Sequence, residues 1–194
     1  MKKGNSKTIQ EGLYQEIDIP NGIEANVSEN IITIESNGKK MKRNFVPIIN
    51  IRIKENKIII SANMKRKKER KLFFSYIAHI KNMLHGLEEN FEYKLKISNV
   101  HFPMNASFNK EKREFVIKNF LGEKKDRTIK IIENVEINIK GDEIIVSSYD
   151  IEKAGRTAAD IEKCSKVRNF DRRVYQDGIF IIEKPRRSYM QWQN

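Results

Sequence analysis

The stretch NIRIKENKIIIS at Asn50–Ser61 recurs in altered form as EINIKGDEIIVS at Glu136–Ser147. In both stretches isoleucines alternate with polar residues around a short polar turn, a pattern typical of a half-buried β-hairpin. Equivalent positions match at one constant offset: Ile51, Ile53, Lys54, Ile58, Ile59 and Ser61 correspond to Ile137, Ile139, Lys140, Ile144, Ile145 and Ser147. A helical pattern follows each copy. We therefore expect one strand-rich unit to occur twice, with most apolar residues in its two cores.

The sequence around the first copy predicts more strands and then a helix. Alternating segments predict strands at 13–19, 25–28, 31–35, 41–45, 49–54 and 58–63, joined by turns rich in Asn and Gly. This order predicts an antiparallel meander. From Leu72 to Leu87 apolar residues recur at steps of three and four, the stripe of an amphipathic helix, which Gly86 is expected to end.

The second copy repeats this order. Strands are expected at 93–100, 104–108, 114–119, 128–132 and 179–183, besides the hairpin itself, and a helix at 151–165. Ala154, Ala158, Ile161 and either Cys164 or Ser165 would face the sheet. The predicted fold class is α+β, with two similar tandem domains that arose by duplication, each a small, mainly antiparallel sheet covered by a helix. The expected divisions are a flexible lead at 1–12, domains at 13–88 and 89–184, and a basic and aromatic tail at 185–194.

The charge balance indicates the kind of partner. The chain has a formal net charge of +12 and a pI of about 9.7, which favours polyanionic partners, nucleic acid first and an anionic membrane surface second. Its one cysteine, Cys164, excludes an internal disulfide and favours a reducing compartment. The basic N-terminus lacks the apolar core of a secretory signal, and no run approaches the roughly 18 apolar residues of a membrane helix. A soluble, intracellular protein is expected.

The sequence shows no motif for catalysis, metal binding or a cofactor. His79, His85 and His101 have no carboxylate or cysteine at metal-ligand spacing, and they are expected to lie on the surface, in the core or against RNA. A Gly-rich phosphate loop, a nucleophile elbow and paired zinc ligands are all absent from the sequence. Cys164 lies in a predicted helix without an activating base, so a buried structural thiol is expected. The interpretation is a protein that is not an enzyme and needs no cofactor or metal.

A first basic run crowds the start of the first predicted helix. Cations there oppose the helix dipole by roughly 0.3–1 kcal/mol each at low salt, which favours an external anion such as a phosphate backbone. A solvated face or a disordered loop is the alternative. The candidate RNA-binding residues of this run are Lys65, Arg66, Lys67, Lys68 and Arg70.

A second basic run covers the second predicted helix and continues beyond it, with aromatic residues interleaved. Arginine forks pair phosphates bidentately, and aromatic rings stack on bases or riboses. Phe170 and Tyr175 could instead pack under the last strand. Asp171 and Asp177 are expected to pin neighbouring arginines or the Asp177-Gly178 turn. The basic residues of this run are Lys153, Arg156, Lys163, Lys166, Arg168, Arg172, Arg173, Lys184, Arg186 and Arg187, and the interleaved aromatic residues are Phe170, Tyr175, Tyr189 and Trp192.

Three stretches carry a resemblance to a known family. HFPM at His101–Met104, NFLGEK at Asn119–Lys124 and VRNFDRRVYQDGIFI at Val167–Ile181 are similar to the large-subunit ribosomal protein six family, called protein nine in eukaryotes, in its archaeal and eukaryotic branch. The resemblance covers nearly the whole chain, and the last stretch is the specific one. The tail after Pro185 matches no part of the family pattern.

The resemblance implies two α+β domains and a structural role in the cytoplasmic ribosome. It implies binding to large-subunit rRNA near the docking region of the translation GTPases, chiefly through the second domain. The RNA-facing residues would then be Arg156, Lys166, Arg168, Arg172, Arg173, Tyr175 and the cluster Lys184, Arg186 and Arg187. The implied partners are this rRNA, neighbouring ribosomal proteins and, transiently, the GTPases, with no membrane. Two alternatives remain: an RNA-processing enzyme that uses the same basic surface, and a free RNA-binding regulator.

Overall fold

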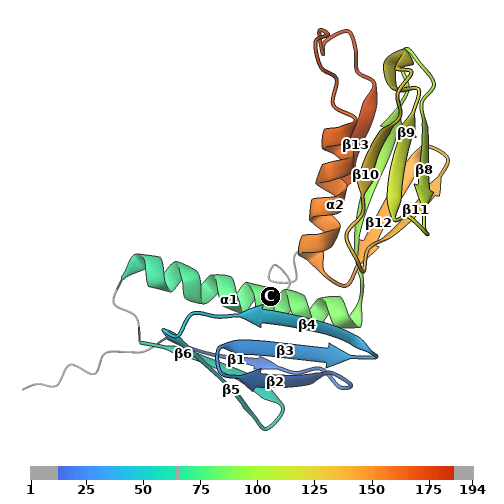
Figure 1. Ribbon diagram of the computed structural model, residues 1–194. Coiled ribbons are helices and arrows are strands. Elements are labelled where there is room, and N and C mark those ends of the chain that lie inside the picture. The colour runs from blue at the N-terminus through green and yellow to red at the C-terminus, as the bar shows by residue number, and fades with distance from the viewer. Residues whose placement is uncertain (1–12, 64–65, 186–194) are drawn as a thin grey trace, which may run out of the picture. The chain divides into compact units, whose positions relative to one another are not determined.

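The computed structural model describes residues 13–63 and 66–185. The chain forms two compact units, Met1–Leu87 and Glu88–Asn194, which we call unit 1 and unit 2 (Figure 1). Several expectations concern residues outside the described ranges: the flexible lead at 1–12, the candidate residues Lys65, Arg186 and Arg187, and the tail with Tyr189 and Trp192.

Unit 1 contains two three-stranded antiparallel sheets and one long helix. The sheets have the strand orders β1-β6-β5 and β2-β3-β4. The elements are β1 (Leu13–Asp18), β2 (Glu24–Ser28), β3 (Ile31–Ser36), β4 (Lys39–Asn44), β5 (Ile49–Lys54), β6 (Lys57–Ala62) and α1 (Lys67–Glu88).

The expectation of one continuous meander in unit 1 is wrong. β1 pairs with β6, from Leu13 opposite Ala62 to Asp18 opposite Lys57, whereas β2 starts a separate sheet. The end of β1 is held at the β5–β6 turn, where the Ile19 N–H donates to the Asn56 carbonyl at 3.0 Å. Alternation along a sequence identifies strands, but it does not fix which strand lies beside which.

The helix α1 confirms the predicted amphipathic stripe. Its buried side chains are Phe73, Ile77, Ile80, Met83, Leu84 and Leu87. The expected stop at Gly86 is wrong, because Gly86 is itself buried and the helix continues to Glu88, which lets Leu87 reach the core. Within the described residues, no helix is both long enough and apolar enough to cross a membrane.

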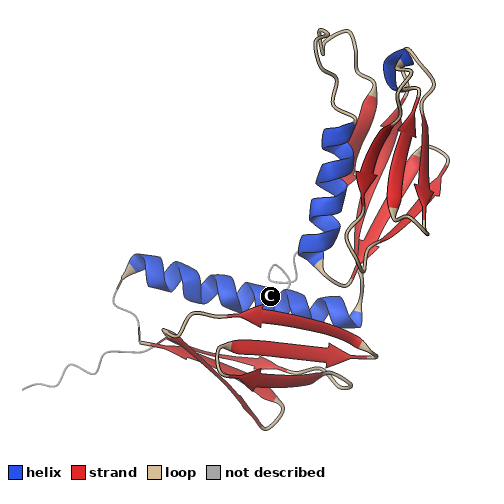
Figure 2. Ribbon diagram, viewed as in Figure 1, coloured by secondary structure: helices blue, strands red, loops and turns tan. Residues whose placement is uncertain are grey.

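Unit 2 repeats this arrangement and adds a strand (Figures 1 and 2). Its antiparallel sheets have the orders β11-β12-β7-β13 and β10-β9-β8. The elements are β7 (Phe91–Ser98), β8 (Asn105–Asn109), β9 (Glu114–Lys118), the 3-10 turn η1 (Phe120–Gly122), β10 (Arg127–Lys130), β11 (Glu136–Lys140), β12 (Glu143–Ser148), α2 (Ile151–Cys164) and β13 (Gly178–Glu183).

The two hairpins of the repeat have the same register. Ile51 faces Ile60 in β5 and β6, and Ile137 faces Val146 in β11 and β12. The order β1-β6-β5 corresponds to β7-β12-β11, and β13 has no counterpart among the described strands of unit 1. The prediction of a duplicated α+β fold is confirmed, although each unit has two sheets where one was expected.

The helix α2 packs closely on its sheet because its inner face is small. Asp150 caps its N-terminus and accepts the Glu152 N–H at 2.9 Å. Ala154, Ala158 and Ile161 are fully buried, as predicted. Ala158 and Ile161 lie in one core cluster with residues from both sheets, among them Leu95, Phe115, Ile117, Ile144, Val146 and Ile179. Ser165 is buried at the end of the helix, and Cys164 is half-buried.

Side chains at the end of α2 accept hydrogen bonds from backbone N–H groups on the outer edge of β13. The Ile179 N–H donates to Ser165 Oγ at 2.8 Å, and the Ile181 N–H donates to Glu162 Oε1 at 3.1 Å. Among the described strands β13 is the last of its sheet, so no strand beside it accepts from these two N–H groups. The contacts fix the segment between α2 and β13 at both of its ends.

We expect Ser165→Ala to destabilise unit 2 by about 1–3 kcal/mol, because it leaves the buried Ile179 N–H without an acceptor. Equilibrium urea unfolding, followed by circular dichroism, would measure the change. The control is Ser107→Ala, which removes an exposed hydroxyl from β8. Equal effects of the two substitutions would contradict this role of Ser165.

Candidate nucleic-acid interface

Three loops that are distant in the sequence meet at one end of unit 2 (Figure 1). We call this surface the loop end: residues 99–104, 119–127 and 165–178. Asn119 Nδ2 donates to the Pro103 carbonyl at 2.9 Å. Gly122 lies against Phe102, since a Cβ at Gly122 would be 3.6 Å from that ring. The loop end therefore brings together the stretches HFPM and NFLGEK, and the third stretch joins them through Asp177.

Asp177 ties the third loop to the first. Its Oδ1 accepts the N–H groups of Val100 and His101 at 2.8 and 2.9 Å, and its Oδ2 lies 2.7 Å from His101 Nδ1. Burial acts to raise the pKa of Asp177, but the hydrogen bonds from His101, Val100 and Phe102 outweigh it and lower the pKa to about 2. Asp177 thus holds the His101 loop; it does not pin a neighbouring arginine.

Arg127 ties the second loop to the third. Its Nη1 donates to the carbonyls of Cys164 and Lys166 at 2.6 and 3.2 Å, its Nε donates to Glu123 at 2.8 Å, and its guanidinium lies 4.0 Å from the centre of the Phe120 ring. The sequence interpretation missed Arg127. The available signal was the spacing of Glu123 and Arg127, an acid and a base four residues apart.

The half-buried Cys164 has the character of a structural thiol. Burial raises the pKa of the Cys164 thiol, although Arg127 and Arg168 act in the opposite direction. Within 13–63 and 66–185, no group of three or more His, Cys, Asp or Glu side chains is placed to hold a metal ion.

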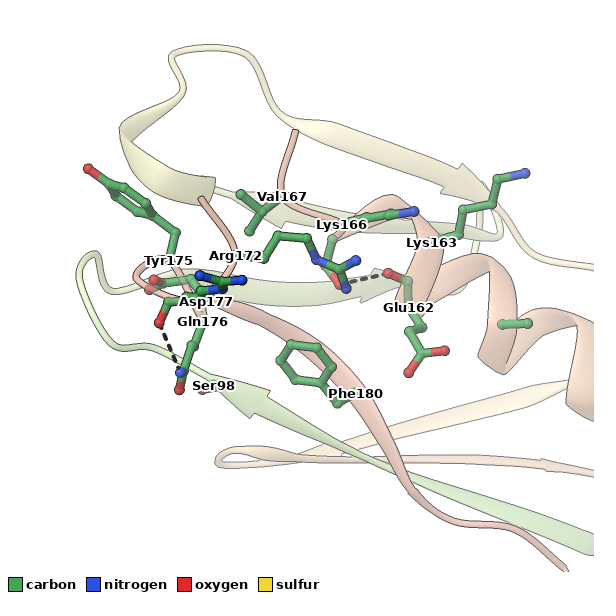
Figure 3. Close-up of a pocket in the computed structure, with 13 residues that line it drawn as sticks. Ser98, Glu162, Lys163, Lys166, Val167, Arg172, Tyr175, Gln176, Asp177 and Phe180 are labelled. Carbon is green, nitrogen blue, oxygen red and sulfur yellow. Dashed lines mark hydrogen bonds between the residues drawn. The ribbon is translucent and has the colours of Figure 1, made fainter. Parts of the chain in front are cut away.

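Tyr175 is packed between two rings of the loop end. Its ring centre lies 4.8 Å from that of His101 and 4.7 Å from that of Phe170. The ring faces are therefore engaged within the protein. In Figure 3 the Tyr175 hydroxyl points away from the other labelled side chains.

A hollow of about 890 Å³ opens between the end of α2, the third loop and β13 (Figure 3). Its cationic lining residues are Lys163, Lys166, Arg172 and Arg173. In Figure 3 Arg172 and Phe180 extend into the same space from the loop and from β13. The other lining residues are Ser98, Ala159, Glu162, Ser165, Val167, Tyr175, Gln176 and Asp177.

The carboxylates beside these cations are engaged by the protein. Glu123 is bound by Arg127, Glu162 accepts the Ile181 N–H, and Asp171 accepts the Arg173 N–H at 2.9 Å. Among the described residues, no ion pair involves the four cations of the hollow. Within the described residues, the surface therefore presents guanidinium and ammonium groups that make no ion pair with a carboxylate, which suits a phosphate backbone.

The structure places the candidate residues of unit 2 in different surroundings. Lys166, Arg172, Arg173 and Tyr175 line the hollow. Arg168 belongs to the loop end outside the hollow, and its charge contributes to lowering the pKa of Glu123, which is lowered mainly by the hydrogen bond from Arg127.

Two further candidates of unit 2 lie away from the hollow. Arg156 lies on the exposed side of α2, with its Nε 3.9 Å from Asp160. Lys184 follows β13 at the end opposite Gly178 and is exposed. The structure therefore gathers only part of the second basic run into one surface.

The candidates of unit 1 form a separate group. Arg66, Lys67, Lys68 and Arg70 are exposed at the start of α1. Glu69, in the first turn, accepts the Arg66 N–H at 3.1 Å and places an acid at the positive end of the helix dipole.

Phe180 is a lining residue that the sequence interpretation did not select. Its side chain is 43% exposed, whereas the adjacent Ile179 is fully buried. The alternation of β13 was the available signal, because an aromatic residue on the outward side of a strand is not needed for the core.

Comparisons with known proteins agree with these observations. The model of the family described as ribosomal protein L6 matches residues 102–178, which begin and end in the loop end. The protein called large ribosomal subunit protein uL6 from Methanococcus vannielii is 39% identical over 89% of this chain and 94% of its own length. Its namesakes from Sulfurisphaera tokodaii and Staphylothermus marinus are 41% and 42% identical over 89% and 88% of this chain, and over 92% and 94% of their own lengths.

Proposed function

Because this chain belongs to the ribosomal protein L6 family, we propose that its loop end binds large-subunit rRNA near the docking region of the translation GTPases. Family membership makes the chain a structural constituent of the large ribosomal subunit and not an enzyme. The observation that carries the proposal is the meeting of the three family-like stretches in one cationic surface whose neighbouring carboxylates are already engaged.

The charge of the loop end supports RNA as the ligand. Lysine and arginine side chains that replace counterions along a phosphate backbone give strong binding that weakens steeply with salt. Each contact lowers the slope of log affinity against log salt concentration by about 0.7–0.9. We propose that unit 2 is the main RNA-binding unit, with Arg168, Arg156 and Lys184 as flanking contacts. The basic start of α1 is a further candidate contact of unit 1.

The location can be tested by cleavage from tethered iron. A Cys164→Ser background with Val174→Cys would carry the probe at the loop end, where Val174 is 57% exposed. Lys112→Cys, in the turn between β8 and β9, would carry it at the opposite end of those strands. In reconstituted large subunits, we expect rRNA cleavage near the GTPase docking region from position 174 and a different pattern from position 112. Cleavage from position 174 that maps elsewhere would overturn the proposed location.

Sedimentation offers a simpler prediction. Nearly all of the protein should travel with the large subunit at moderate salt and leave it only at high salt, because several phosphate contacts must be broken together. The measurement is the fraction of the protein in the subunit peak across a salt series. A mainly free pool at moderate salt would favour a regulator that acts outside the ribosome.

A further inference from the structure

We propose that the hollow of unit 2 receives a single unpaired nucleotide, with its base against Phe180 and its phosphate among Lys166, Arg172 and Arg173. This inference rests on the proposed function, since it requires that the loop end binds RNA. Beyond the proposed function, the RNA in the hollow is an extruded or looped nucleotide and not a continuous duplex.

The shape of the surface favours an extruded nucleotide. A double-stranded A-form helix presents a wide, shallow minor groove, which proteins contact with protruding elements. The hollow is instead concave, and its volume of about 890 Å³ falls within the range of about 300–1,000 Å³ that is typical of small-ligand sites. Unpaired bases of loops and bulges can be turned out into such a space and held by stacking.

Phe180 supplies a ring on which a base can stack. A Cβ at Gly178 would lie 3.0 Å from the Phe180 ring, so one part of the ring lies close over the backbone of Gly178. The side chain nevertheless remains 43% exposed and lines the hollow. Because Gly178 has no side chain, it contacts the Phe180 ring without covering it. A solvent-exposed aromatic ring is a surface on which a base can stack.

The polar groups around Phe180 suit a nucleotide with its phosphate. Lys166, Arg172 and Arg173 approach from the loop side and make no ion pair among the described residues. Gln176 Nε2 donates to the Arg173 carbonyl at 3.2 Å, which leaves Gln176 Oε1 as an acceptor for a base edge. Ser98 adds a hydroxyl to the lining. Among the described lining residues the carboxylates are Glu162 and the buried Asp177, and Glu162 Oε1 accepts the Ile181 N–H.

Chemical probing of large-subunit rRNA, with the full-length chain bound, tests the inference. We compare the wild type, Phe180→Tyr, which keeps the ring, and Phe180→Leu, which removes it. One unpaired base should be protected at its Watson–Crick edge by the wild type and by Phe180→Tyr. With Phe180→Leu that base should become reactive, and affinity should fall about tenfold. Unchanged protection with Phe180→Leu would overturn the inference.

Two further measurements keep the outcome unambiguous. If Phe180→Leu lowers the urea midpoint, Gln176→Ala tests the hollow from its other side and should expose the same base. A photoreactive benzoyl group at position 180 should crosslink to RNA in assembled subunits; a crosslink to a neighbouring protein would show that a peptide fills the hollow and would overturn the inference.

If the chain binds rRNA but no base depends on position 180, only this inference fails. If the wild type does not bind rRNA, the proposed function fails as well.

Discussion

Replacing Arg172 and Arg173 together with alanine is expected to weaken binding to large-subunit rRNA about a hundredfold at low salt. Each guanidinium can make charge-assisted hydrogen bonds worth at least about 1.5 kcal/mol, and about 1.4 kcal/mol corresponds to a factor of ten. Both side chains are exposed, line the hollow and make no ion pair within the described residues. Their removal should therefore leave the fold of unit 2 intact.

Salt dependence separates lost phosphate contacts from a damaged structure. The slope of log affinity against log salt should fall by about 1.4–1.8 for the two contacts. Filter binding across a salt series would give both numbers. The matched control is Lys110→Ala with Lys112→Ala, which removes the same charge from an exposed turn at the far end of β8 and β9. Equal losses for both double variants would show that affinity depends on net charge alone.

Asp177→Asn is expected to destabilise unit 2 by about 2–4 kcal/mol at neutral pH. The carboxylate of Asp177 is 1% exposed, and it accepts hydrogen bonds from three backbone N–H groups and from the His101 ring. The amide of asparagine would either point its NH2 group at these N–H donors or leave some of them without an acceptor, and both are costly in a buried site. Urea unfolding of the full-length chain would measure the change.

The same carboxylate predicts a pH dependence. The pKa of Asp177 is lowered from 3.8 to about 2 in the folded protein. When folding lowers the pKa of a carboxyl group, its charged form stabilises the folded protein. This stabilisation is fully present above the pKa of the group in the unfolded chain, and it is lost as the pH falls through the pKa of the group in the folded protein. Asp177 should thus contribute about 2 kcal/mol above about pH 4, and this contribution should disappear between about pH 4 and pH 2. The difference between wild type and Asp177→Asn should shrink over that range.

Asp171→Asn is the matched control, because Asp171 is an exposed acid in the same loop. It should change the urea midpoint little at any pH. A wild type and an Asp177→Asn variant that lose stability in parallel down to pH 2 would show that Asp177 does not carry this acid sensitivity.

The scaffold could be predicted from periodicity because each element has a single dominant pattern. The alternation of isoleucines such as Ile51 and Ile53 around a polar turn predicted a hairpin, and the structure has β5 and β6 there. The pairing of β1 with β6 was not predictable in the same way, since it depends on contacts such as that between Ile19 and Asn56. Local patterns carry no information about such long-range partners.

The candidate site was predictable in composition but not in arrangement. Arg172 and Arg173 could be selected from the sequence because they form a basic run. Nothing in the sequence shows that Glu123 and Glu162 are engaged by the protein while these arginines are not. The roles of Asp177 and Arg127 depend on hydrogen bonds across more than thirty residues, as the separations of 76 and 37 residues show.

The closure of β13 by Ser165 and Glu162 bears on the protein before it joins its subunit. A terminal strand with free N–H groups is a template on which another chain can add, and such addition leads to aggregation. Here the side chains of Ser165 and Glu162 already accept hydrogen bonds from the N–H groups of Ile179 and Ile181. Copies of the protein that are not yet bound to RNA are therefore protected, along this edge of the sheet, from adding their strands to one another.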